Sequence, residues 1–284
     1  MNLGFELWLF AICVGASALG GMLGMASGIF VVPLLSVFGH VPLRTAIGAS
    51  IVSVIACSCG SAAPYLRARL TNVRLALVLE TATTAGALTG VFLAGFIPVP
   101  YLFALFAIIL LLSAQQMLWR RGRPAVTTPT GDARWAGLGL DGSYPDDSGR
   151  SVAYGVDRLQ LGMLLMYGAG LVSALLGIGS GVLKIPAMDT ALRLPIKVSS
   201  ATSNFMIGVT AAASAGVYFV RGDVVTAIAG PVALGSVVGS QLGARILMRM
   251  SNERLRVLFV IILLVLAAQM LLSAFGIGHA GGGE

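Results

Sequence analysis

The chain alternates between long apolar runs and short polar segments. The apolar runs cover residues 7–23, 29–38, 45–65, 75–94, 101–118, 161–176, 182–192, 201–220, 224–242 and 257–275. Most are close to the length of about 17–25 residues that a helix needs to cross a bilayer. The second and seventh runs are too short to span alone and suit half-helices or re-entrant segments. The pattern predicts an all-α polytopic membrane protein.

Two glycine-rich breaks precede the two short runs, and they are copies of one motif. The first is Gly24–Gly28, with the sequence GMASG, and Pro33 follows it. The second is Gly177–Gly181, with the sequence GIGSG, and Pro186 follows it. Glycine permits sharp turns and proline fits poorly inside a helix, so each break is expected to interrupt a helix.

The numbering offset between the breaks, 177 − 24 = 153, holds along the chain without a gap. Residues 116–118 (QML) recur at 269–271, and the small residues at 82, 86 and 90 fall on the glycines at 235, 239 and 243. Such rows of small residues are typical of close helix packing. The offset predicts two five-segment membrane repeats at 1–123 and 158–275, each beginning with a broken helix pair.

The basic residues predict how the repeats are oriented. They follow the third and fifth runs in the first copy, but the seventh and ninth runs in the second copy. If each broken pair returns to its own side of the membrane, 15 of the 18 Lys and Arg residues lie in the cytoplasm. A parallel arrangement gives a weaker bias, so the positive-inside rule favours inverted repeats with both termini outside.

Residues 124–157 form the long polar linker, which this orientation makes cytoplasmic. The segments Leu138–Tyr144 and Ser151–Gly155 flank a turn sequence, Pro145–Gly149, so we expect a small β-hairpin. The glycine-rich tail at 276–284 is expected to be flexible.

Composition excludes a soluble fold. The chain is 57% hydrophobic and only 10% charged, whereas soluble domains carry roughly 25% charged residues. Its net charge of +7 comes from arginines in predicted cytoplasmic loops, so no nucleic-acid partner is expected. The first run lacks a preceding basic region and belongs to the repeat, so it is not read as a cleaved signal peptide.

The chemistry-bearing residues do not indicate an enzyme. Both histidines, His40 and His279, lie outside the apolar runs, and no Ser-His-Asp arrangement or His/Cys metal-ligand spacing is present. Cys57 and Cys59 supply two thiols, too few for a structural zinc site. They either pack a membrane helix or contact a sulfur-containing substrate. We therefore expect no catalytic residues, metal or cofactor.

The breaks instead suit an anion. A helix that restarts after a break exposes backbone N–H groups and the positive end of its dipole. These groups are expected at Ser27 and Gly28 in the first repeat and at Ser180 and Gly181 in the second. In inverted repeats the two helix ends can converge near the midplane. The alternative is that the glycines only permit tight packing.

Further polar residues lie in or near these segments. Lys184 stands where the first repeat has Val31, so its charge is a candidate substrate contact, or it reaches an interface instead. Polar groups on the helices after the broken pairs either line the same cavity or bond between helices; they are Ser50, Thr202, Ser203 and Asn204. Glu80, an acid within a span, either carries a coupling proton or pairs with Lys184 or an arginine.

The paired motifs, with the Ala201–Thr210 segment (ATSNFMIGVT), resemble the TauE/SafE family of sulfite and organosulfonate exporters. The usual family motif is Gly-x-Gly-Gly-Gly; here Ser27 and Ser180 replace the fourth residue and Ala26 the third. The resemblance implies a secondary transporter of small sulfur-containing anions, acting as an exporter in the bacterial inner membrane. A channel-like anion pore is the alternative. Protons are a candidate coupling ion, and the oligomeric state stays open, a homodimer included.

Overall fold

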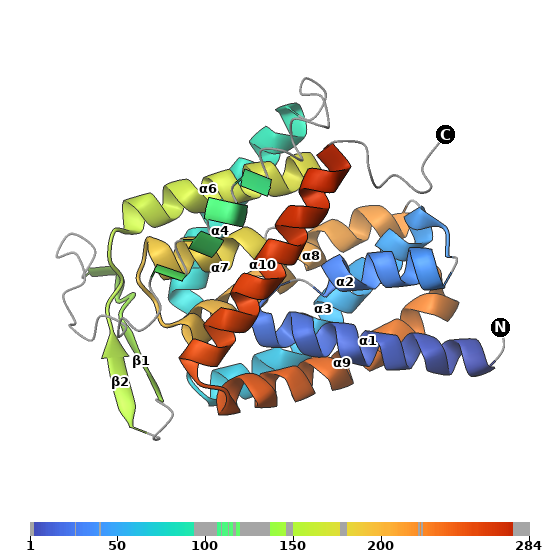
Figure 1. Cartoon of the computed structure of the whole chain (residues 1–284), viewed down its shortest axis with the longest axis horizontal. Coiled ribbons are helices and arrows are strands. Elements are labelled where there is room, and N and C mark those ends of the chain that lie inside the picture. The colour runs from blue at the N-terminus through green and yellow to red at the C-terminus, as the bar shows by residue number, and fades with distance from the viewer. Residues whose placement is uncertain are drawn as a thin grey trace.

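The structure is a computed structural model that describes residues 3–25, 27–39, 41–93, 137–145, 150–176, 181–220, 222 and 224–274, with part of 107–119. It is mostly helical (Figure 1). The elements of the first half are α1 (Leu3–Leu23), α2 (Gly28–Pro33), the π-helical η1 (Leu34–Phe38), α3 (Leu43–Arg67) and α4 (Val73–Leu93). After the strands β1 (Gly142–Pro145) and β2 (Ser151–Tyr154) come α6 (Leu159–Leu176), α7 (Gly181–Thr190), α8 (Ile196–Val220), α9 (Thr226–Arg249) and α10 (Asn252–Ala274).

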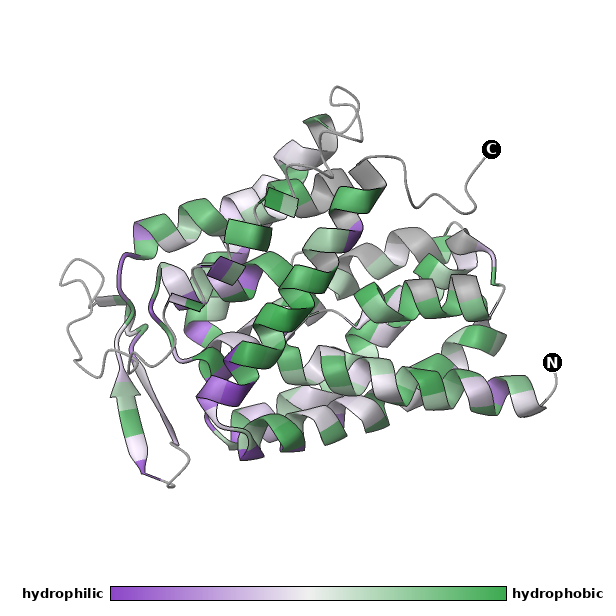
Figure 2. Cartoon of the chain, in the orientation of Figure 1, coloured by the Kyte–Doolittle hydropathy of each residue, from purple (hydrophilic) through white to green (hydrophobic). Residues whose placement is uncertain are grey.

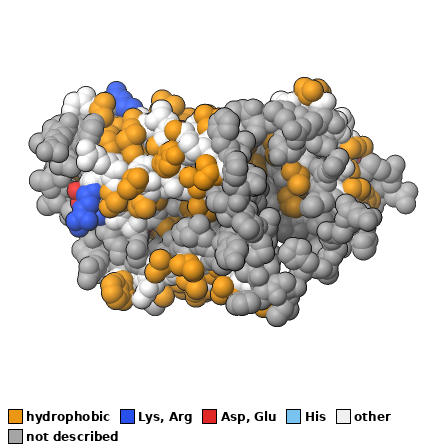
Figure 3. Space-filling model, turned by 90° about the horizontal axis from the view of Figure 1, so that it is seen from above, with side chains coloured by type: hydrophobic (Ala, Val, Ile, Leu, Met, Phe, Trp, Pro, Cys, Tyr) orange, Lys and Arg blue, Asp and Glu red, His pale blue; other side chains and the backbone are white. Residues whose placement is uncertain are grey.

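The outer surface of the helices is apolar. Among the described residues, three helices are long and apolar enough to cross a membrane, at Gly4–Leu23, Thr45–Arg67 and Thr226–Arg249. Large side chains such as Leu77, Leu164 and Leu234 are exposed, and hydrophobic side chains spread over the face in Figure 3. Hydrophilic residues gather towards the hairpin end of the molecule (Figure 2). Apolar surface on this scale needs a lipid environment, which confirms the predicted all-α membrane class.

Rows of small residues bring two pairs of helices into backbone contact. α1 packs along α9, and α4 packs along α6. A Cβ on Gly86 of α4 would lie 1.9 Å from the Tyr167 carbonyl oxygen of α6. The glycine row of α9 faces backbone carbonyls of α1 in the same way, in the pairs Gly235 with Phe10, Gly239 with Val14 and Gly243 with Ala18. The rows of small residues predicted from sequence therefore lie at contacts between helices.

Both short apolar runs form short helices. Gly24 ends the first long helix with a φ of 65°, a left-handed conformation that suits glycine. α2 begins at Gly28 and ends at Pro33, after which the chain continues as the π-helix η1. Proline lacks the N–H that an α-helix needs, so the α-helical hydrogen-bond pattern is interrupted at this point. The second short run forms α7, which contains Pro186 and is buried from Gly181 to Asp189.

The linker contains a two-stranded antiparallel hairpin, with Gly142 opposite Tyr154 and Pro145 opposite Ser151. Tyr144 and Tyr154 are buried against the helices. Asn72, between α3 and α4, donates from Nδ2 to the Leu140 carbonyl at 2.7 Å and to the Tyr154 hydroxyl at 3.3 Å. The Asn72 side chain therefore helps to fix the hairpin to the membrane helices, together with the two buried tyrosines.

Asn72→Ala should lower the free energy of unfolding by about 2 kcal/mol. The Asn72 Oδ1 also accepts the Leu75 N–H at 3.0 Å, which caps the start of α4, so the substitution removes a helix cap and both hairpin bonds. Equilibrium unfolding in mixed micelles measures this. Thr81→Ala is the control, because the exposed Thr81 hydroxyl bonds only within its own helix. Equal stability of the two variants would contradict the anchoring role.

Candidate functional site

A buried ion pair lies one turn into α7. The Lys184 ammonium is 2.9 Å from Oε2 of Glu80 on α4, and the two side chains are 0% and 12% exposed. The Thr210 hydroxyl of α8 donates to the other Glu80 oxygen, Oε1. Three helices that are distant in sequence therefore meet at one carboxylate. The pair explains how a lysine can be fully buried among apolar helices, because an unpaired ammonium there would be very costly.

The field at this point favours negative charge. Lys184 lies in the first turn of α7, where the helix dipole is positive. The positive charge of the ammonium therefore adds to the partial positive charge of the helix end. Glu80 of α4 is the acid that faces both. Asp189, further along α7, is bonded at 2.9 Å to Arg256 of α10. An anion that approached Lys184 would compete with the Glu80 carboxylate.

Four buried serines surround the first break. Ser27, directly before α2, shares a hydrogen bond of 2.9 Å with Ser53 of α3. Ser53 is also 2.7 Å from the Ser236 hydroxyl of α9 and 3.4 Å from the Ser17 hydroxyl of α1. All four are 0% exposed. The break is thus held in a cluster of hydroxyl groups, each of which can donate or accept.

One face of α8 links the first break to the Lys184–Glu80 pair. A Cβ on Gly24 would lie 2.2 Å from the Ser200 carbonyl oxygen, and Ser203 donates to the Gly24 carbonyl at 2.8 Å. Ser203 and Thr210 are seven residues apart, which puts them on the same face of the helix at a spacing of about 10 Å. The first break and the Lys184–Glu80 pair therefore contact the same side of α8.

The comparisons with known proteins agree with this architecture. Residues 9–270 match the protein family described as "Sulfite exporter TauE/SafE". The chain belongs to the TauE/SafE family. It is also 25% identical over 264 residues to the "Probable membrane transporter protein YunE" of Bacillus subtilis (strain 168), an alignment that covers 90% of this chain and 93% of that protein. No solved structure matches it. The predicted class, a membrane transporter of this family, is thereby confirmed.

In this TauE/SafE protein the expected site residues fall into separate groups. Lys184 and Glu80 are paired, and Gly181 begins α7 in a buried position. Ser27 belongs to the serine cluster. A Cβ on Gly28 would lie 3.5 Å from the hydroxyl of Ser50, which itself donates to Ile47 O at 2.8 Å. Ser180 lies outside the described residues.

The polar residues of α8 do not all face one place. Ser203 contacts the first break. Asn204 accepts from Ser58 at its carbonyl and donates to Ser61, so it joins α8 to α3. Thr202 accepts the Asn72 N–H at 3.1 Å, which orients it towards the loop between α3 and α4. Of these three, Ser203 is therefore the one bonded to a glycine-rich break.

Several residues of the candidate site were not singled out from sequence. Thr210 falls on Cys57 at the offset of 153, and Ser236 falls on Thr83. A search for positions that are polar in both repeats could have found them. Ser53 and Ser17 have no such mate, and only their packing around Ser27 shows their place.

Proposed function

We propose that this protein is a secondary transporter that exports small sulfur-containing anions, sulfite or an organosulfonate, across the bacterial inner membrane. The observation that carries the proposal is the fully buried Lys184, held by Glu80 at the positive end of a short helix inside a membrane fold. Soluble anions need such a charge to leave water. Family membership supports the sulfur-containing class, because the family is described by sulfite export.

We propose further that the two halves are inverted repeats. Counting from the start of each half, α1 and α6 are the first helices, and α4 and α9 are the fourth. The first helix of each half packs on the fourth helix of the other half, as expected for two units related by a two-fold axis. The ends of α3 and α9 that carry Arg67 and Arg245 line one groove. The positive-inside rule would put this end, with the linker, in the cytoplasm and both termini outside.

In the proposed cycle the anion binds at the two breaks. Backbone N–H groups and hydroxyls at Ser27, Gly28, Ser180 and Gly181 would hold it, and Lys184 would supply its counter-charge. Ser203 would orient the anion from α8, with contributions from the remaining polar candidates, Ser50, Thr202 and Asn204. Alternating access is needed, because Lys184 is completely buried and an anion can reach it only when the helices move.

Glu80 gives the cycle a means of coupling. While Glu80 is ionised it neutralises Lys184. A proton on Glu80 would release the ammonium for the anion, so that anion and proton would bind and cross together. Export of both against an inward proton gradient would then require a large outward anion gradient. Thr210 bonds the same carboxylate and would hold its position in either state. Transport driven by the anion gradient alone is the alternative.

Transport by purified protein in proteoliposomes tests the function. Liposomes loaded with unlabelled sulfite should accumulate labelled sulfite against its gradient, and uptake should saturate. Sulfoacetate, thiosulfate and sulfate serve as competitors that define the substrate class. A channel-like pore would give neither saturation nor counterflow. Counterflow with sulfate but not with sulfite or sulfoacetate would contradict the assigned substrates.

A further inference from the structure

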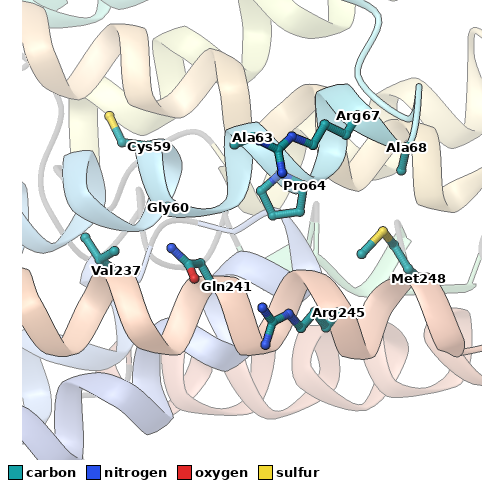
Figure 4. A pocket seen from close by; sticks show the side chains of 10 residues that line it. All are labelled: Cys59, Gly60, Ala63, Pro64, Arg67, Ala68, Val237, Gln241, Arg245 and Met248. Atoms are coloured by element: carbon teal, nitrogen blue, oxygen red, sulfur yellow. The ribbon is translucent and has the colours of Figure 1, made fainter.

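A groove of about 770 Å³ opens on the surface between α3 and α9, away from the site described above (Figure 4). None of its lining residues belongs to the Lys184–Glu80 pair or to the serine cluster. It is lined mainly by the last turns of the two helices. The residues that matter for its chemistry are Pro64, Arg67, Val237, Gln241, Arg245 and Met248.

The sequence explains why the helices separate here. At Gly60 they touch, since a Cβ there would lie 2.3 Å from the Ser240 hydroxyl and 3.0 Å from the Val237 carbonyl oxygen. Beyond Gly60, α3 contains Pro64, which cannot donate to the preceding turn and disturbs a helix at that point. Small residues, Ala63 and Ala68, line the same wall, so no large side chain fills the space between the helices.

Two arginines and an amide supply polar groups to this groove. Arg67 projects from α3, and Gln241 and Arg245 project from α9 (Figure 4). In the part of the chain that the structure describes, neither Arg67 nor Arg245 makes an ion pair or a hydrogen bond with the protein. Among the described residues, none of those that line the groove is acidic. Both guanidinium groups are therefore available to an anionic group of another molecule.

An apolar stripe leads away from the arginines. Leu234, Val238, Leu242 and Ile246 are exposed to between 42% and 66%. They recur every four residues, so they form one stripe along α9, about 18 Å long from first to last. One leaflet of hydrocarbon is about 15 Å thick. An acyl chain along this stripe would place its headgroup at the level of Arg245.

We propose that the groove binds an anionic phospholipid. The phosphate lies on the Arg67 and Arg245 guanidinium groups, the Gln241 amide donates to a headgroup oxygen, and an acyl chain follows the α9 stripe. A free inorganic anion would use the same guanidinium groups but would have no need of the stripe. A basic groove between membrane helices on the side that collects arginines is a recurrent form of lipid recognition. This inference depends on the membrane location and not on the transported substrate.

Native mass spectrometry of the intact chain in detergent tests the inference. Phosphatidylglycerol and phosphatidylcholine with identical acyl chains are the probes. Wild-type protein should retain phosphatidylglycerol preferentially. Each arginine near a membrane surface contributes on the order of fivefold in affinity, so Arg67→Ala with Arg245→Ala should weaken retention about 25-fold. Arg249→Ala is the matched control, because it removes the same charge from the last turn of α9 outside the groove.

Three results would overturn the assignment. They are equal retention of the two lipids, equal retention by the double variant and wild type, and displacement of phosphatidylglycerol by millimolar phosphate or sulfate. The last would identify a free-anion site.

A measurement on wild-type protein covers the case in which the double variant misfolds. Cys59 is exposed and lines the groove, whereas Cys13 and Cys57 are buried. Phosphatidylglycerol should slow maleimide labelling of Cys59 more than phosphatidylcholine does, and equal labelling rates would also refute the site.

Discussion

Lys184→Met should reduce anion counterflow in proteoliposomes by at least about a hundredfold, the largest effect on transport expected of any single substitution here. The variant removes the cation that the anion needs and leaves the Glu80 carboxylate without its ammonium. Breaking a buried pair from one side costs about 3–5 kcal/mol of stability. Transport and equilibrium unfolding are therefore measured on the same preparations.

Glu80→Gln separates binding from coupling. The amide keeps the shape of the side chain and a hydrogen bond to Thr210, but it carries no charge and no titratable proton. Lys184 then lacks its counter-ion, so we expect the anion to bind more tightly and transport to lose its dependence on pH. A variant in which Lys184 and Glu80 are both Met should regain stability but not transport. Asp157→Asn is the control, because the Asp157–Arg193 pair is exposed by more than a third on both sides and should contribute within about 1 kcal/mol.

Two outcomes would contradict this assignment. Unchanged transport by Lys184→Met would remove Lys184 from the anion site. Transport restored in the double Met variant would mean that the pair serves only stability. A folded Glu80→Gln variant whose transport keeps the pH dependence of wild type would instead exclude Glu80 as the coupling group and leave the anion site intact.

The sequence was sufficient for the class of fold and the positions of the breaks, because both depend on local chemistry. The apolar runs are long, and glycine at position 24 readily adopts the left-handed φ of 65° that ends α1. A constant offset of 153 is visible without any structure. The run expected at 182–192 is α7, Gly181–Thr190, whereas α9 continues to Arg249, beyond the run expected at 224–242. The expected linker strands, Leu138–Tyr144 and Ser151–Gly155, overlap β1 and β2.

The partners within the site could not be obtained in this way, because they depend on long-range packing. Lys184 and Glu80 are 104 residues apart, and Ser53 and Ser236 are 183 apart. From sequence, Glu80 could pair with Lys184 or with an arginine. The packing of α4, α7 and α8 shows that its partners are Lys184 and Thr210. The groove at Arg67 and Arg245 is a similar case. In the sequence, each arginine is typical of the cytoplasmic end of a membrane helix, and nothing indicates that the two lie together.

Gly24→Ala should destabilise the fold by more than about 3 kcal/mol, an effect on folding as large as that expected from breaking the Lys184–Glu80 pair. The glycine has a φ of 65°, which costs roughly 1–2 kcal/mol for an L-residue with a side chain. A Cβ would also lie 2.2 Å from the Ser200 carbonyl oxygen, so the first break would have to move away from α8. Equilibrium unfolding in mixed micelles measures the loss. Gly15→Ala is the matched control in α1, where a Cβ meets nothing within 4 Å, and it should be neutral or slightly stabilising.

Gly28→Ala then separates the two roles that a glycine-rich break can have. A Cβ at Gly28 would lie 3.2 Å from a Val54 methyl group, a contact that a small shift relieves, so we expect a loss of stability of about 1 kcal/mol. If the anion approaches the backbone at the start of α2, the same methyl group should weaken transport at least tenfold. Normal transport by a stable Gly28→Ala variant would mean that the glycines of the first break permit close packing and take no part in binding. Gly24→Ala cannot make this distinction, because Gly24 is held between helices by Ser200 and Ser203, whereas Gly28 begins a helix whose first N–H groups are the ones proposed to meet the anion.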